Sequence, residues 1–208
     1  MKNIIIDKII NLIQSYYHYD DIKIKEIRYG LESIYLTILK LIIVIILSLI
    51  IHVFKELCLF FLFYGILRAT GFGLHAKNSI ECWIFTLLFF TSFPFLIKHL
   101  IINNNYLLIG SIILLPLIIK YAPADTEKRP LINKKKRNIY KIITTFTTII
   151  YILIIYFHKN VYISKAMFFS ILFESLLVLP ISYRLLGLQY NNYKRYKKGG
   201  KKWNYLLL

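Results

Sequence analysis

The sequence predicts an all-α polytopic membrane protein, with about six transmembrane or partly re-entrant helices and an amphipathic N-terminal helix. Three observations support this fold class. Hydrophobic residues make up 58% of the 208 residues and the mean hydropathy is +0.59, whereas soluble domains are about 45–50% apolar. Several apolar runs approach the roughly 20 residues that a helix needs to cross a bilayer. The basic residues lie between and after these runs, which is the pattern that sets membrane topology.

The first 30 residues are predicted to precede the membrane domain as a separate region. Isoleucine and leucine recur at helical spacing over residues 3–17, while polar side chains such as Asp7 and Gln14 fill the gaps. This pattern is typical of an amphipathic helix that lies on a membrane or against a helical bundle. Residues 19–28 are interpreted as a charged link. Because charged and polar side chains interrupt the N-terminal apolar run, we expect no cleavable signal peptide.

One membrane domain is predicted over residues 31–190, followed by a basic tail over residues 191–208. Its apolar segments are residues 35–54, 56–67, 79–97, 106–121, 139–157 and 162–186. The second segment has only about twelve residues, so we expect it to be short, tilted or partly re-entrant. We see no internal repeat.

The net charge of +17 predicts an orientation rather than a nucleic-acid partner. With both termini in the cytoplasm, most of the 27 lysine and arginine residues fall on the cytoplasmic side, as the positive-inside rule requires. We therefore expect membrane lipids as partners and no nucleic acid. The same orientation puts residues 68–82, a polar interruption between the second and third segments, at the cytoplasmic face.

This polar interruption is the candidate chemical site. Asn78 and Glu81 have the spacing of a capping box, which predicts that the third span begins near Asn78. Cys82 then lies in the first turns of that helix, where the helix N-terminus favours a thiolate. The other polar or turn-forming residues of the interruption are Arg68, Gly71, Gly73, His75 and Lys77.

The spacing of His75 and Cys82 limits what the two residues can do together. In one continuous helix they would lie about two turns, or roughly 10 Å, apart, and direct proton transfer needs about 2.6–3.2 Å. A cysteine nucleophile with a histidine base therefore requires that the chain folds back at Gly71 and Gly73. A packed cysteine and a hydrogen-bonded interface histidine remain open alternatives. A metal site is not expected, because one histidine and one cysteine lack a second ligand pair.

Arg68, Gly73, His75, Ala76 and Cys82 resemble the signature of the accessory gene regulator protein B (AgrB) family, which are membrane peptidases of Gram-positive quorum sensing. Residues 29–32 (Tyr-Gly-Leu-Glu), residues 122–126 (Ala-Pro-Ala-Asp-Thr) and the chain length agree with this resemblance. Phe72 departs from it, because the family pattern has a second glycine there. Gly71 could take the place of that glycine.

The resemblance implies a cysteine endopeptidase of the bacterial cell membrane that needs no cofactor. Such proteins cut a precursor peptide on the C-terminal side of its signal core, hold the core as a thioester and release a cyclic thiolactone or lactone. Cys82 would be the nucleophile and His75 the general base, with Arg68, Gly71 and Gly73 in support. The precursor would have an amphipathic leader and an acidic tail, and similar proteins suggest a homodimer.

Basic residues near the site are candidates for binding an acidic peptide, although such runs also serve topology and anionic-lipid binding. Asp125 and Glu127 are candidates for orienting His75 or for a structural role. The substrate-binding candidates are Lys77, Asp125, Lys128, Arg129, Lys134, Lys135, Lys136 and Arg137.

Two other function classes fit parts of the sequence. A small transporter or permease would account for Pro94, Pro116 and the intramembrane charges Lys40 and Glu174, but not for His75 and Cys82 beside a glycine turn. A non-enzymatic membrane scaffold would account for the basic loops alone.

Overall fold

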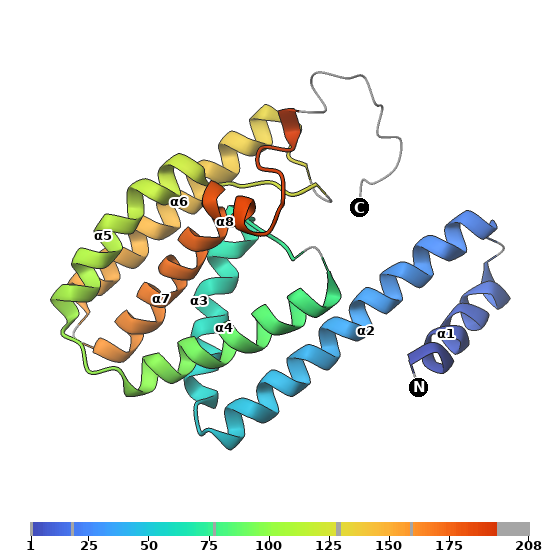
Figure 1. The fold of residues 1–208 in the computed structure, drawn as a ribbon, viewed down its shortest axis with the longest axis horizontal. Coiled ribbons are helices and arrows are strands. Elements are labelled where there is room, and N and C mark those ends of the chain that lie inside the picture. The colour runs from blue at the N-terminus through green and yellow to red at the C-terminus, as the bar shows by residue number, and fades with distance from the viewer. Residues whose placement is uncertain (1, 18, 77, 128–129, 159, 195–208) are drawn as a thin grey trace. The chain divides into compact units, whose positions relative to one another are not determined.

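The computed structural model describes residues 2–17, 19–76, 78–127, 130–158 and 160–194 (Figure 1). These residues form eight helices and no strand, which confirms the all-α prediction. Five of these helices, α2, α4, α5, α6 and α7, are long and apolar enough to cross a membrane. The helices are α1 (Lys2–Tyr16), α2 (Asp21–Ile50), α3 (Phe54–Gly71), α4 (Ser79–His99), α5 (Asn104–Tyr121), α6 (Lys134–Phe157), α7 (Val161–Val178) and α8 (Pro180–Leu185).

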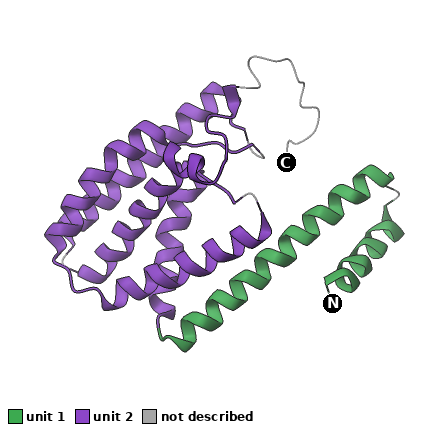
Figure 2. Ribbon diagram, in the orientation of Figure 1, with its two compact units in different colours: residues 1–52 green, residues 53–208 purple. Residues whose placement is uncertain are grey.

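The chain divides into two compact units, residues 1–52 and 53–208 (Figure 2). The first unit contains α1, which is the predicted amphipathic helix, and α2. Ile6 and Ile10 of α1 are buried. The charged link that we predicted over residues 19–28 is wrong, because α2 already begins at Asp21. The Asp20 carboxylate accepts the backbone N–H of Lys23 at 3.2 Å and so caps the helix.

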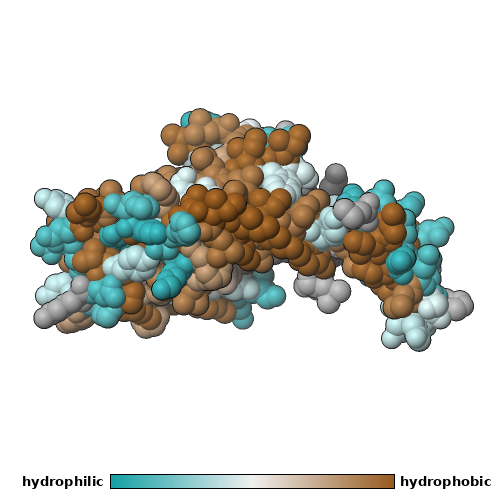
Figure 3. Space-filling view, turned by 90° about the horizontal axis from the view of Figure 1, so that it is seen from below, coloured by the Kyte–Doolittle hydropathy of each residue, from teal (hydrophilic) through white to brown (hydrophobic). Residues whose placement is uncertain are grey.

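The second unit is built around α7, which packs against α3, α4, α5 and α6 (Figure 1). Aromatic side chains from α3, α4 and α7 form one buried cluster, which includes Phe60, Phe93 and Phe173. Large apolar side chains on the outer faces of the helices stay exposed, and apolar residues cover much of the surface seen in Figure 3. Such a surface suits contact with lipid, as expected of a polytopic membrane protein.

The predicted last span, residues 162–186, is broken in the structure. The helix α7 ends at Val178, Leu179 is extended, and α8 starts at Pro180. A proline has no N–H to continue the helical ladder, and it disfavours the helical conformation of the residue before it. The Leu176 carbonyl instead accepts the Ser182 hydroxyl at 2.6 Å. This break leaves the last carbonyls of α7 available to other parts of the chain.

The second apolar segment is longer than its apolar run suggested. The helix α3 has 18 residues and continues to Gly71. It includes the charged residues Lys55, Glu56 and Arg68. The polar interruption of the sequence therefore begins on a helix, and Arg68 lies in the last turn of that helix.

Candidate active site

The chain between α3 and α4 leaves the helical conformation, as a paired role of His75 and Cys82 requires. The helix α3 ends at Gly71, and α4 starts at Ser79 with Asn78 as its N-cap. Gly73 has a φ of 87°, a conformation that glycine adopts without a steric penalty. His75 therefore lies outside the helix that carries Cys82. We call residues 72–76 the active-site turn.

Phe72 shows how the chain tolerates the departure from the glycine pair. Its φ is 58°, which costs a non-glycine residue about 1–3 kcal/mol. The Phe72 ring packs against the ring of Tyr140 on α6, with 5.1 Å between their centroids. This contact offsets part of the backbone cost that glycine would avoid.

Backbone hydrogen bonds tie the active-site turn to two distant segments. The Gly73 N–H donates to the Ala124 carbonyl at 2.8 Å, and the Ala124 N–H donates to the Gly71 carbonyl at 3.1 Å. The Leu74 N–H donates at 2.8 Å to the carbonyl of Leu177, in the last turn of α7. The break before Pro180 thus frees a carbonyl that holds the residue next to His75.

Arg68 fixes the same turn from the end of α3. Its Nη2 donates to the Leu74 carbonyl at 2.7 Å and to the Gly73 carbonyl at 3.3 Å. Its Nη1 lies 3.9 Å from the Oε2 of Glu174, a fully buried residue of α7. Arg68 therefore connects α3, the active-site turn and α7.

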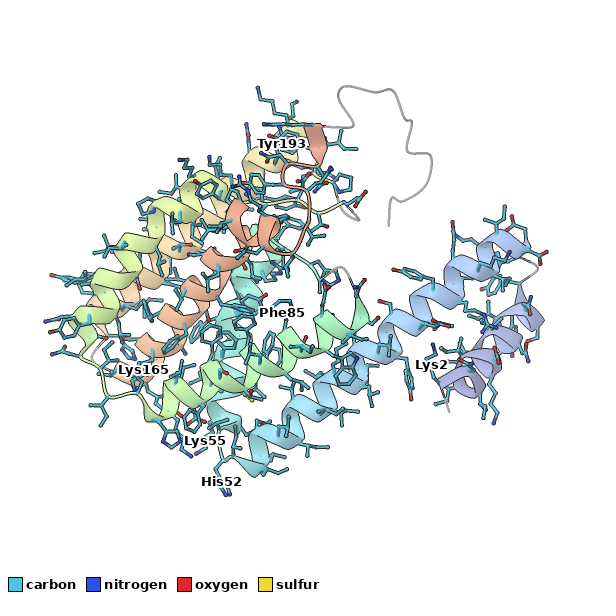
Figure 4. The ribbon with its side chains drawn as sticks, viewed as in Figure 1. Lys2, His52, Lys55, Phe85, Lys165 and Tyr193 are labelled. Carbon is cyan, nitrogen blue, oxygen red and sulfur yellow. The ribbon has the colours of Figure 1, made fainter. Side chains whose placement is uncertain are left out.

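A cavity of about 360 Å³ brings His75, Cys82 and Arg68 together. Most of its remaining wall is apolar and comes from α3, α4, α7 and α8; Figure 4 labels one of these side chains, Phe85 of α4. His75 is exposed and Cys82 is half-buried. The arrangement gives a thiol, an imidazole and a guanidinium access to one largely apolar space. The other lining residues include Tyr64, Leu74, Ala76, Thr86, Phe89, Phe90, Phe173, Leu176, Leu177, Ser182, Leu185 and Leu186.

The start of α4 is only partly the capping box that we predicted. Asn78 is the N-cap, and the Cys82 N–H donates to its carbonyl at 3.0 Å. The Asn78 side chain does not accept a backbone N–H of α4; its Nδ2 instead donates to the Glu81 carboxylate at 3.3 Å. The helix start is confirmed, and Cys82 lies in its first turns.

Asp125 lies in a structural contact. Its carboxylate accepts the backbone N–H groups of Leu131 at 3.3 Å, Asn192 at 2.9 Å and Tyr193 at 2.7 Å. Burial raises the pKa of the Asp125 carboxyl, and these N–H groups partly oppose that shift. The contacts tie the loop before α6 to the segment after α8, and Asp125 is not among the described residues that line the cavity.

The predicted basic residues divide into three groups. Lys134, Lys135 and Lys136 are exposed in the first turn of α6. Arg137 donates to the Leu131 carbonyl at 2.9 Å and stacks on the Tyr193 ring, with 3.8 Å from its Cζ to the ring centroid, so it stabilises the same loop as Asp125. Lys77, Lys128 and Arg129 lie outside the described residues.

Sequence reasoning missed two contributors to the site. We had connected Glu174 only with a transporter, although a carboxylate in an apolar span is itself a signal of a specific partner. Pro180 was the available signal for the carbonyl of Leu177, because a proline within an apolar run predicts a helix break. Neither residue reveals from sequence which distant segment it serves.

Comparisons with known proteins point to the same family as the sequence resemblance. A family model described as Accessory gene regulator B matches residues 6–178. The chain is 33% identical over 178 residues to accessory gene regulator protein B of Staphylococcus aureus, covering 85% of this chain and 93% of that protein. The protein of the same name from Staphylococcus epidermidis is 34% identical over 183 residues, with 85% and 92% covered. An AgrB-like protein of Clostridium acetobutylicum is 34% identical over 179 residues, covering 86% of both chains. No solved structure matches the chain significantly.

Proposed function

Because this chain belongs to the accessory gene regulator B family, we propose that it is a membrane-embedded cysteine endopeptidase that matures a quorum-sensing signal peptide. One observation carries the proposal. His75 leaves the helix of Cys82, and both residues line the same cavity. A transporter or a scaffold gives no reason for that arrangement.

The proposed reaction has two acyl transfers. In the first, the Cys82 thiol passes its proton to His75 and its sulfur attacks the carbonyl at the C-terminal side of the signal core. His75 then gives the proton to the leaving amine, and the core stays on Cys82 as a thioester. In the second, a thiol or hydroxyl of the core gives its proton to His75 and attacks the thioester. The ring closes as a thiolactone or lactone, and His75 returns the proton to Cys82.

The apolar walls of the cavity support cyclisation over hydrolysis. A thioester keeps its activation only while water is held away from its carbonyl. Phe85, Phe89 and Phe90 of α4 and Phe173 of α7 provide such a wall. Backbone N–H groups at the start of α4 would hydrogen-bond the oxyanion of each tetrahedral intermediate.

The orientation and the partners belong to the same proposal. The distribution of the basic residues supports an orientation with both termini and the site at the cytoplasmic face. The exposed lysines Lys134, Lys135 and Lys136 would attract the acidic tail of the precursor peptide as well as anionic lipids. A second copy of the chain is the proposed partner protein.

Co-expression with a short precursor peptide that has an amphipathic leader and an acidic tail tests the proposal, with mass spectrometry of the peptide products. We expect that Cys82→Ala and His75→Ala abolish cleavage, and that Cys82→Ser accumulates a slowly released ester. Cys58→Ala is the matched control, because Cys58 is exposed on α3 and is absent from the described cavity lining. Cleaved peptide from Cys82→Ala would refute the peptidase, and intact peptide exported by the wild type would favour a transporter.

A further inference from the structure

We propose that Glu174 is a positioning residue of this active site, which holds Arg68 in the conformation that fixes the turn before His75. The inference rests on the proposed peptidase function and adds a residue of α7 to it. Glu174 does not line the described cavity, although its neighbours Phe173, Leu176 and Leu177 do. Its effect on the reaction must therefore pass through another residue.

The burial of Glu174 calls for a specific reason. The residue is fully buried in α7, the helix at the centre of the second unit. Glutamate is almost never fully buried without a partner, and removing an isolated carboxylate from water is costly. An apolar residue of similar volume at this position would make the folded protein equally or more stable.

Arg68 is the cation that faces Glu174. The Glu174 Oε2 lies 3.9 Å from the Arg68 Nη1. Among the described residues, this nitrogen and both carboxylate oxygens have no hydrogen-bond partner. The Arg68 Nη2, in contrast, donates to the carbonyls of Gly73 and Leu74. One nitrogen of the guanidinium thus faces α7 while the other holds the two residues before His75.

Glu174 also contacts the end of α3 and neighbours a second anchor. A Cβ atom placed on Gly71 would collide with the Glu174 carboxyl group, so the absence of a side chain at Gly71 makes room for the carboxylate. Three residues further along α7, the Leu177 carbonyl accepts the Leu74 N–H. Residues three apart share a helix face, so one face of α7 supports the turn by charge and by a hydrogen bond.

Loss of the Glu174 charge should therefore disturb the geometry of the reaction more than the binding of the peptide. Without the carboxylate, nothing on α7 holds the Arg68 side chain in its present orientation by charge. A displacement of about 1 Å in a reacting group can reduce the rate about a hundredfold. The cavity walls that would contact the peptide do not include Glu174 and would be retained.

The test uses the full-length protein in lipid vesicles with the synthetic precursor peptide. We expect Glu174→Gln to lower kcat about 10- to 100-fold while KM changes less than about twofold. Arg68→Gln should lower kcat as well, and the double variant should be no slower than Arg68→Gln, because the two residues act in series. Glu174→Asp, which keeps the charge, should recover part of kcat.

Ser175→Ala is the matched control. Ser175 is equally buried on α7, and its hydroxyl donates to the Ile171 carbonyl of its own helix at 2.7 Å, so kcat should stay within about twofold. Wild-type kcat in Glu174→Gln, or losses that multiply in the double variant, would overturn the inference while Cys82-dependent cleavage leaves the proposed function intact. Cleavage by Cys82→Ala would instead remove the proposed function. If Glu174→Gln does not accumulate, Glu174→Asp decides: reduced kcat at an unchanged melting temperature supports the inference, and unchanged kcat overturns it.

Discussion

The helix pair α3 and α7 buries one carboxylate near each of its ends, and the two have different surroundings. At the end where Lys55 and Lys165 lie (Figure 4), Glu56 of α3 accepts a hydrogen bond from the Tyr162 hydroxyl of α7. At the opposite end, Glu174 of α7 faces Arg68 of α3 without a hydrogen bond to it among the described residues.

The Glu56 end pairs each of its buried charged side chains, Glu56 and Lys165, with a polar group of the helical bundle. Lys165 is buried there as well, and its Nζ donates to the Ile97 carbonyl in the last turn of α4 at 3.1 Å. None of these residues lines the described cavity. At the Glu174 end, the Arg68 guanidinium donates hydrogen bonds to carbonyls of the active-site turn and, within the described part of the chain, none to the Glu174 carboxylate. Hydrogen bonding is the rule for buried polar groups, and among the residues described the Glu174 carboxylate departs from it while Arg68 binds the two residues before His75.

Of the substitutions considered, Arg68→Lys should have the largest effect, a loss of activity caused by disruption of the contacts at the Glu174 end. A lysine is a point charge and cannot direct separate nitrogens at the two carbonyls and at Glu174, so we expect kcat of precursor cleavage to fall about a hundredfold. The comparison at the other end is Lys165→Met, which should lower the melting temperature in detergent and leave kcat within about twofold. Retention of more than half of the activity in Arg68→Lys would remove the distinction between the two ends.

A comparison of Gly71→Ala with Gly65→Ala tests, within α3, whether contact with Glu174 matters for activity. The alanine methyl group at residue 71 would collide with the Glu174 carboxyl group, whereas the position of a Cβ at Gly65 has no atom within 4 Å. We expect Gly71→Ala to reduce kcat about tenfold. Gly65→Ala should leave kcat unchanged and stabilise α3 by about 0.5–1 kcal/mol. Equal kcat values for the two variants would show that contact with Glu174 does not affect the turn.

Tyr162→Phe should produce the smallest change, and in stability rather than in rate. Removing the hydroxyl leaves Glu56 without its hydrogen-bond donor, which costs about 1–3 kcal/mol and corresponds to roughly 2–4 °C in melting temperature per kcal/mol for a chain of this size. Thermal unfolding in detergent measures the stability, and peptide cleavage below the melting temperature measures the rate. A tenfold loss of kcat at full stability would mean that the Glu56 end also serves the reaction.

The fold was predictable to the extent that it depends on local signals. Apolar length predicted most of the helices. The structure adds a further local signal, since Asn103, Asn133 and Asn160 each accept a backbone N–H at the start of α5, α6 and α7. The errors have local causes too. The acidic residues at the start of α2 resemble a charged link in sequence, although they suit a helix N-terminus. Pro180 breaks the helix within an apolar run that is long enough to suggest one span.

The candidate site was predictable only in part. The sequence singled out Arg68, His75 and Cys82 and required a break between the last two, and the structure brings all three to one cavity. Their roles in catalysis remain predictions. The pairs of Arg68 with Glu174, Leu74 with Leu177 and Gly73 with Ala124 join residues that are far apart in the chain. Periodicity and spacing describe one helix at a time, so they cannot indicate which helices meet.

The broken end of α7 has a consequence for the growing chain. Proteins are synthesised from the N-terminus at about 5–20 residues per second, so the active-site turn leaves the ribosome well before Glu174 and the carbonyl of Leu177 that anchors Leu74. Until the final span is inserted beside α3, the turn lacks its supports on that side. A nascent protein therefore acquires the geometry described here only after α7 has been synthesised and packed beside α3, so the proposed cleavage would begin only once the bundle is assembled.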